Sequence, residues 1–381
     1  MCEKNNLLVR ENREPIIDIL KGITILLVVY GHTWPFCREF IYLFHMAVFM
    51  IASGLCFSFT EKTRVGVLKY VLKKVKTLYI PFVVANIAFL LLTDVFVKIG
   101  FYTDNPLFLD ETIMWPVNQG LQYQLTVNVM LRAILKVFLF VGPTQMGTAT
   151  WFLTVLFSVQ VIHCFLVYIM RKCDQRKQKV IWLVVVIFFA LSSQMISTIN
   201  PTTIYALKCF PCMYLAFLMG RAIKMTPISM NVLYGWRGAV ISTGILMVMS
   251  LFIRIELSSG KIDNVFAYLV ASACGWCMLC FIATTISRVP KVTILFQYIG
   301  KHTMPILCLH VLSFKIVSII YINVTQTNRL LLAAFHVIFN AGEIWKIGYL
   351  LVGVLVPLLL YLFYNIIKFN CMKCIISKSR F

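Results

Sequence analysis

The sequence predicts an all-α integral membrane protein with about ten transmembrane helices. Of its 381 residues, 60% are hydrophobic and only 13% are charged. Apolar runs of about 20 residues recur along the chain, which is the length that a helix needs to cross a bilayer. Only helices and closed barrels satisfy their own backbone hydrogen bonds in lipid, and unbroken apolar runs exclude a barrel.

Short connections rich in lysine and arginine separate the expected spans. The segment Val117–Val141 is apolar but contains Arg132 and Lys136, which suits an interfacial or re-entrant helix better than a full span. The full spans are expected near Ile16–Phe36, Phe40–Thr60, Thr77–Ile99, Ala149–Met170, Val180–Ile199, Thr203–Gly220, Gly238–Leu257, Asn264–Ile286, Thr303–Asn323 and Gly348–Phe369.

The formal net charge of +21 does not indicate a nucleic-acid partner, because the basic residues lie in the short loops between spans. That distribution is the positive-inside pattern, and it places both termini in the cytosol. We expect a cytoplasmic segment 1–15, a polytopic membrane domain 16–369 and a basic cytoplasmic tail 370–381, in a multi-pass protein of the inner or plasma membrane. A basic cytosolic surface suits anionic lipid head groups or a polyphosphorylated cofactor.

Asp18, Lys21 and His32 are three ionisable residues within the first expected span. A charge inside a membrane costs roughly 2.5–3.5 kcal/mol on insertion scales, so such residues usually face a cavity. At about 100° per residue, Lys21 and His32 lie within about 20° of each other, and Asp18 lies within about 60° of both. One helix face therefore runs for about 16 Å from a charged mouth to a deeper imidazole.

Short motifs occur in order through nearly the whole chain. They are Arg13-Glu-Pro-Ile-Ile-Asp18-Ile-Leu-Lys21-Gly22, Val29-Tyr-Gly31-His32, Phe44-His45-Met46-Ala-Val-Phe49, Leu78-Tyr-Ile-Pro81, Trp151-Phe-Leu153 and Gly300-Lys-His-Thr-Met-Pro-Ile-Leu-Cys-Leu-His310. Together they resemble the acyltransferase 3 family of integral-membrane acyltransferases, and most closely its fucose 4-O-acetylase-like branch. Two positions depart from the family pattern: Lys21 stands where arginine is frequent, and Ala47 where proline is frequent.

The resemblance implies transfer of an acetyl or other acyl group from acetyl-CoA or another acyl-CoA to a hydroxyl of a cell-surface glycan or glycolipid, without a metal. We expect His32 to act as the general base or as a transient acyl carrier, because imidazole accepts protons near neutral pH. Lys21 is expected to bind the carbonyl oxygen, the pantetheine amides or a phosphate, and Asp18 to fix Lys21 or a cytosolic loop. An ion pair that only anchors the inner end of the span explains Asp18 and Lys21 equally well.

Two histidines and a tryptophan are further candidates for the substrate-binding site. We expect His45 and His310 to lie near His32 and Trp151 to form a substrate platform. An interfacial position explains His45 and Trp151 as well. The other three histidines receive no role; they are His163, His302 and His336.

Three lysines before the third expected span are the candidates for binding the donor. Lys73, Lys74 and Lys76 are expected to hold the nucleotide phosphates of coenzyme A, although any positive-inside loop would carry such lysines. Ser53-Gly54 in the second span is interpreted as close helix packing rather than as a nucleophile.

Two other classes of function remain open. Intramembrane charges also suit a transporter or flippase for a polysaccharide or lipid-linked sugar, but the sequence has no inverted repeat. A membrane thiol oxidoreductase would use the closely spaced pairs Cys209-Phe-Pro-Cys212 and Cys274-Gly-Trp-Cys277. These cysteines lie within expected spans, so they are interpreted as small hydrophobic residues.

Overall fold

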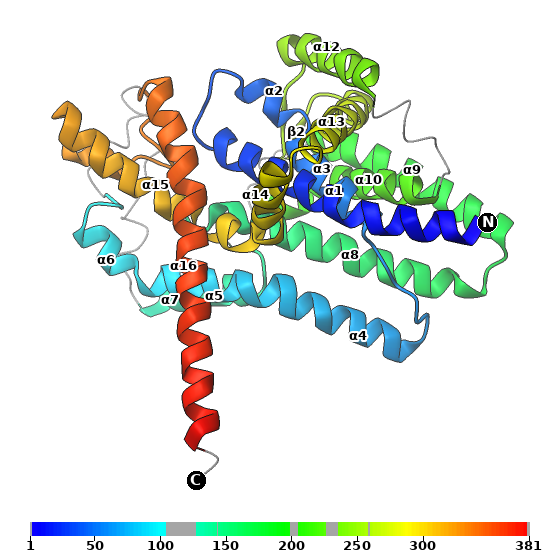
Figure 1. The fold of residues 1–381 in the computed structure, drawn as a ribbon, viewed down its shortest axis with the longest axis horizontal. Coiled ribbons are helices and arrows are strands. Elements are labelled where there is room, and N and C mark those ends of the chain that lie inside the picture. Colours follow the sequence, from blue (N-terminus) through cyan, green and yellow to red (C-terminus); the bar gives the residue numbers. More distant parts are fainter. Residues whose placement is uncertain are drawn as a thin grey trace.

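The computed structural model describes residues 2–103, 127–142, 144–198, 205–225, 235–257 and 260–378. These residues are overwhelmingly helical (Figure 1), which confirms the expected all-α class. A short antiparallel hairpin pairs β1 (Ile255–Glu256) with β2 (Lys261–Ile262). The α-helices are α1 (Cys2–Gly31), α2 (Arg38–Tyr42), α3 (His45–Leu55), α4 (Arg64–Lys74), α5 (Ile80–Leu91), α6 (Thr93–Lys98), α7 (Val127–Phe138), α8 (Trp151–Ile169), α9 (Gln175–Thr198), α10 (Tyr205–Met225), α12 (Trp236–Phe252), α13 (Val265–Ile286), α14 (Pro290–Lys301), α15 (Thr303–Thr325) and α16 (Glu343–Lys378).

Seven helical segments of the described residues are long and apolar enough to cross a membrane. The two longest, Arg64–Leu91 and Glu343–Asn370, have 28 residues each. The described part of helix α7 has 12 residues. Since residues 117–126 of the segment Val117–Val141 lie outside the described part, its expected interfacial or re-entrant character stays a prediction. The expected total of about ten spans and the cytosolic termini stay predictions.

Several helices end or begin away from their expected bounds. Helix α1 ends at Gly31 rather than near Phe36, because the chain turns at Trp34, whose φ is 55°. The helix of the third span begins at Arg64 rather than near Thr77. There the Thr63 hydroxyl accepts a hydrogen bond from the Gly66 backbone N–H at 3.0 Å and caps the helix,. The lysines expected in a cytosolic loop therefore lie on α4 and on the π-helical turn that follows it.

Two further elements differ from expectation in the second half of the chain. Helix α12 ends at Phe252, and the chain continues into the β hairpin, where a helix was expected as far as Leu257. Helix α14 occupies a segment that was expected to be a loop, with Pro290 at its first turn, where proline is favourable,. Its apolar face packs on α1, which explains why it forms despite its basic residues.

Helix α1 lies at the centre of the fold, where it packs against α3, α13, α14, α15 and α16. Its crossing with α14 is close, because a side chain at Gly22 would collide with the Phe296 carbonyl and one at Gly300 with the Asp18 carbonyl. Helices α3 and α10 cross in the same way at Gly54 and Gly220. The interpretation of Gly54 as a packing residue is thereby confirmed, since small residues let membrane helices approach closely.

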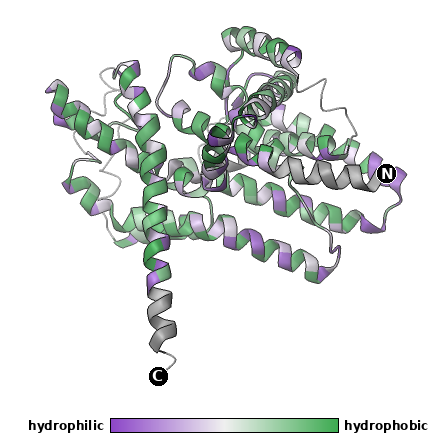
Figure 2. Cartoon of the chain, in the orientation of Figure 1, coloured by the Kyte–Doolittle hydropathy of each residue, from purple (hydrophilic) through white to green (hydrophobic). Residues whose placement is uncertain are grey.

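The outer helices carry the surface that would face lipid. In the apolar 18-residue stretches of α9 and α16, only 6% and 22% of the residues are buried. Both helices are predominantly apolar along their exposed lengths (Figure 2). In Figure 1 the C-terminal part of α16 extends away from the other helices. The functional side chains must therefore be sought on the inner faces of α1, α3, α4, α8 and α15.

Candidate active site

A cavity of about 570 Å³ lies beside α1 and is lined by residues from α1, α3, α4, α8, α14 and α15. Its charged lining residues are four lysines and one aspartate: Lys21, Lys73, Lys74, Lys301 and Asp18. The cavity thus has a basic end, which suits a ligand with several negative charges. Away from this end, the wall is mostly apolar.

The basic end is assembled by local features of two helices. Lys21 Nζ lies 3.4 Å from Asp18 Oδ1, so the pair expected on one face of α1 is confirmed. Helix α4 widens into a π-helical turn over Val75–Tyr79, directly after Lys73 and Lys74. Such a turn shifts the helix face that follows it, and it frequently marks functional sites.

Polar groups also line the apolar part of this cavity. Gln160 Nε2 of α8 donates to Ser53 Oγ of α3 at 2.6 Å, and the Tyr70 hydroxyl lies 3.5 Å from Gln160 Oε1. These three side chains come from three different helices and line the same wall. They offer hydrogen bonds to a ligand that is mainly apolar but contains amides.

A second, smaller cavity of about 40 Å³ adjoins the first. The two cavities share three lining residues, Val28, Met46 and Leu307. Its polar and aromatic lining consists of His32, Tyr42, His45 and Trp151. A continuous lining therefore leads from the basic end at Lys21 to the imidazole of His32.

Three imidazoles gather at this end of the lining. The ring centroid of His32 lies 5.2 Å from that of His310 and 4.7 Å from that of His336. His310 Nδ1 is 2.8 Å from the Ile306 carbonyl, and His45 Nδ1 is 2.8 Å from the Ile41 carbonyl. Because a carbonyl can only accept, both Nδ1 atoms carry a hydrogen, and each neutral ring keeps its Nε2 as a base.

The turn before α8 fixes the position of Trp151. Asn86 of α5 accepts hydrogen bonds from the Thr144 backbone N–H at 2.7 Å and from the Thr144 hydroxyl at 2.9 Å. Its Nδ2 donates to Thr150 Oγ1 at 3.0 Å and to the Phe82 carbonyl at 2.9 Å. This buried network holds the residue that immediately precedes Trp151.

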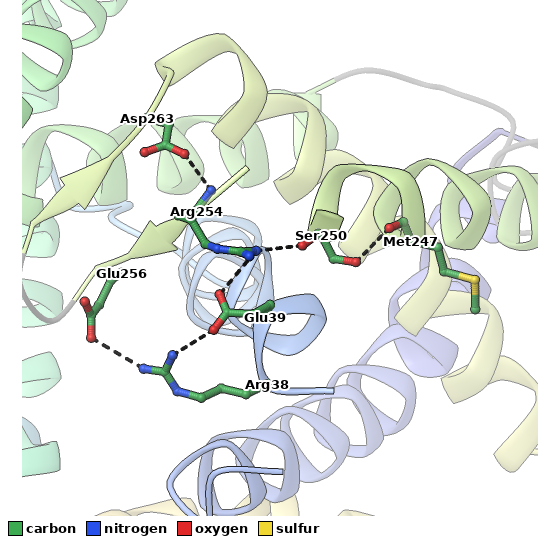
Figure 3. A network of polar contacts seen from close by, with 7 residues as sticks. All are labelled: Arg38, Glu39, Met247, Ser250, Arg254, Glu256 and Asp263. Atoms are coloured by element: carbon green, nitrogen blue, oxygen red, sulfur yellow. Dashed lines mark hydrogen bonds and ion pairs between the residues drawn. The ribbon is translucent and has the colours of Figure 1, made fainter. Parts of the chain in front are cut away.

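A network of charged side chains beside the smaller cavity joins Arg38 and Glu39 to Arg254 and Glu256 (Figure 3). The Arg38 guanidinium lies 3.0 Å from Glu39 Oε1 and 3.4 Å from Glu256 Oε1, and Arg254 lies 3.7 Å from Glu39 Oε2. Arg38 also lies over the rings of Trp34 and Tyr42, at 4.0 and 4.1 Å from their centroids. Since Tyr42 and Leu257 line the cavity, this network sets the positions of part of its wall.

The structure brings together most of the residues expected from the sequence. Asp18, Lys21, Lys73 and Lys74 line the larger cavity; His32, His45 and Trp151 line the smaller one; and His310 contacts His32. Lys76 is exposed on the π-helical turn and is not among the residues that line either cavity.

Sequence reasoning missed three residues near this site. Lys301 lines the basic end, His336 contacts His32, and Lys315 is fully buried behind the loop that carries His336. Lys315 could have been found, because a lysine in the middle of an expected span is a signal of function. No motif in the sequence around His336 predicts its place near His32, because that place depends on how the loop folds.

The paired cysteines lie in the core. Cys209 and Cys212 are both 0% exposed, and the Cys212 thiol donates to the Cys209 carbonyl at 3.0 Å. Cys274 and Cys280 are also buried against core residues. Their packing agrees with the interpretation of these cysteines as small hydrophobic residues.

Comparison with known proteins places this site in a family. The sequence model of the acyltransferase 3 family, described as an acyltransferase domain, matches residues 14–362, which is essentially the whole chain. Searches of the curated proteins and of the solved structures find no match. The matched region contains both cavities and all three clustered histidines. The chain therefore belongs to the acyltransferase 3 family and is a multi-pass membrane acyltransferase.

Proposed function

We propose that this acyltransferase moves an acetyl group from acetyl-CoA to a hydroxyl of a cell-surface glycan or glycolipid. The observation that carries the proposal is the continuous lining of two cavities, from four lysines at one end to His32 at the other. The reaction has no need of a metal, since imidazole and lysine side chains supply its proton transfer and charge stabilisation.

The basic end suits the nucleotide phosphates of coenzyme A. Lys73, Lys74 and Lys301 would contact them from two helices, and Lys21, held by Asp18, would contact either a phosphate or the first part of the pantetheine arm. A charge-assisted hydrogen bond to phosphate is about twice as strong as a neutral one. The apolar wall with Ser53 and Gln160 suits the pantetheine chain and its amides.

His32 would act as the general base at the end of this path. It takes the proton from the acceptor hydroxyl while the oxygen attacks the thioester carbonyl, and it returns the proton to the sulfur as coenzyme A leaves. Lys21 lies on α1 and His32 directly follows the last residue of this helix, about 16 Å further along the axis. An extended pantetheine arm is therefore required to bring the thioester to the histidine.

The acceptor would approach from the opposite side, past Trp151 and His45. The smaller cavity, about 40 Å³, holds little more than one reacting group, since one water occupies about 30 Å³ of liquid volume. We therefore infer that the acceptor hydroxyl enters this cavity while the rest of the sugar lies beyond it, near Tyr42 and Trp151. With the basic end in the cytosol, the donor stays inside the cell and the acyl group is delivered toward the outer leaflet of the cell membrane.

The test is transfer of labelled acetyl from acetyl-CoA by purified protein in detergent, together with mass analysis of surface glycans from cells. His32→Ala should abolish both activities while the amount of protein in the membrane is unchanged. His302→Ala is the matched control, because His302 is half-buried and lies outside both linings. Acetylation retained by His32→Ala would refute the role of His32. Movement of an intact lipid-linked sugar without acetyl transfer would instead identify a flippase.

A further inference from the structure

The loop that joins α15 to α16 is mostly buried over residues 331–338, and this part is bound to α15. Lys315 lies ten residues before the end of α15 at Thr325, about 15 Å back along the helix. Its Nζ donates to the Leu332 carbonyl at 2.8 Å and to the Ala334 carbonyl at 2.7 Å. Irregular backbone at depth in a membrane protein is tolerated only where it is buried in protein or lines a cavity. A loop held in this way indicates a role in the site.

His336 lies in this loop with a strained backbone. Its φ is 60°, and the Val337 N–H donates to the Phe335 carbonyl at 2.9 Å, which closes a tight turn around His336. A residue other than glycine rarely adopts a positive φ, although histidine, asparagine and aspartate do so more often than the rest. Strain of this kind persists where the surrounding structure enforces it, and it gathers at functional sites.

Contacts on both sides hold the turn. Before it, Lys315 binds the carbonyls of Leu332 and Ala334. After it, the Tyr349 hydroxyl accepts from the Ile338 N–H at 3.3 Å and lies 2.9 Å from Ser318 Oγ. The loop is thus fixed to both α15 and α16.

The enforced turn directs the imidazole of His336 to His32. Their ring centroids lie 4.7 Å apart, at an interplanar angle of 32°. His336 Nδ1 is buried and has no hydrogen-bond partner among the described residues. Buried polar atoms nearly always have a hydrogen-bond partner, so a nitrogen without one beside His32 requires an explanation.

The three rings do not form a metal site. Within the described residues, no three histidine, cysteine or acidic side chains have the arrangement needed to hold a metal ion. Burial lowers the pKa of His336 to about 3, and His310, Lys315 and Arg38 add to this shift. His336 is therefore neutral at ordinary pH and can accept a hydrogen bond.

We propose that His336 is a positioning residue of the acyl-transfer reaction, whose Nδ1 accepts a hydrogen bond from His32 when His32 becomes protonated. The inference rests on the proposed function and assigns the residue that stabilises the protonated His32. As the hydroxyl oxygen bonds to the acyl carbon, its proton moves to His32, and the bond between the acyl carbon and sulfur then breaks. His32 returns the proton to the sulfur, while His336 neither gains nor loses one.

The experiment compares three substitutions at His336 in the full-length protein with acetyl-CoA and a fixed acceptor. His336→Phe keeps a ring but removes the acceptor, and we expect kcat to fall at least tenfold while KM for acetyl-CoA changes less than threefold. His336→Asn keeps an acceptor near the position of Nδ1 and tolerates a positive φ, so it should retain at least a third of wild-type kcat. The pH dependence of kcat should show the His32 titration moved to lower pH in His336→Phe, because the protonated ring loses its acceptor.

A glycine substitution keeps the test valid if the phenylalanine variant does not fold. His336→Gly fits the positive φ, and added imidazole should restore at least part of its lost kcat. His163→Phe is the matched control, because His163 is also buried with one unpartnered ring nitrogen but packs against Phe57, Trp182 and Phe217 rather than His32. Its kcat should stay within twofold of wild type.

The outcomes separate this inference from the proposed function. Wild-type kcat in His336→Phe, or equal losses in the Phe and Asn variants, would show that His336 does not act through its ring nitrogen. A change confined to KM would also overturn the inference. A wild-type protein that transfers no acetyl group would refute the proposed function itself.

Discussion

The imidazole of His310 packs 5.2 Å from that of His32, centroid to centroid, and its orientation is fixed by a hydrogen bond from Nδ1 to the Ile306 carbonyl. Both residues were expected in one cavity, but the bond to Ile306 also determines which nitrogen of His310 is the base. Nε2 of His310 is buried without a partner among the described residues. It therefore keeps an unpaired lone pair in the group of imidazoles around His32.

The first prediction concerns this nitrogen. His310→Phe keeps a ring against His32 and removes Nε2, so kcat should fall at least tenfold, which corresponds to about 1.4 kcal/mol of transition-state stabilisation. The Ile306 carbonyl keeps its helical hydrogen bond, so the free energy of unfolding should change by no more than about 1 kcal/mol. Steady-state kinetics and a melting curve in detergent measure the two quantities. A large loss of stability with unchanged kcat would mean that His310 is only structural.

The second prediction concerns the donor site. Lys73→Ala and Lys74→Ala should each raise KM for acetyl-CoA about five- to tenfold, the effect of losing a charge-assisted hydrogen bond of about 1–1.4 kcal/mol. KM should also rise with ionic strength, because salt screens such contacts. Lys76→Ala is the matched control, since Lys76 is exposed and outside the cavity lining. Equal effects of all three substitutions would indicate a diffuse surface charge instead of a built site.

The third prediction tests the crossing of α3 and α10. A methyl group at Gly220 would collide with the Ile51 carbonyl, and two helices would have to separate. Gly220→Ala should therefore lower the free energy of unfolding by about 1–3 kcal/mol. Gly244→Ala, on α12, has no atom within 4 Å of the new methyl group and should be neutral or stabilising by up to about 1 kcal/mol. Melting temperatures of the two variants that move in the same direction would contradict this account.

The fourth prediction concerns Arg38. Its guanidinium joins Glu39 to Glu256 and stacks on Trp34 and Tyr42, so Arg38→Lys keeps the charge but loses the planar group,. We expect KM for the acceptor to rise severalfold while KM for acetyl-CoA is unchanged, because only the wall near Tyr42 and Leu257 shifts. Arg237→Lys, whose guanidinium stacks on a neighbouring exposed tryptophan, is the control and should behave as wild type. A rise in both KM values would indicate a general loss of packing.

Much of the fold could be predicted from the sequence, because long runs of apolar residues indicate the helices of a membrane protein. The bounds were less predictable where local chemistry overrides hydropathy. Thr63 caps a helix that begins within a basic segment, and Trp34 turns the chain before the apolar run is complete. Helix α14 forms because α1 covers its apolar face, and this contact is not visible in the sequence of the segment itself.

The sequence by itself determined the all-α class, the face shared by Asp18, Lys21 and His32, and the family motifs, because helical periodicity and apolar length are local properties. Only the tertiary structure decided that the two cavities adjoin at shared lining residues, that Lys76 lies outside both linings, and that His336 reaches His32. The position of His336 is set by the folding of the loop between α15 and α16. Its carbonyls bind Lys315, and its strained turn is held by Tyr349, so the placement of His336 depends on contacts between segments that are distant in the chain.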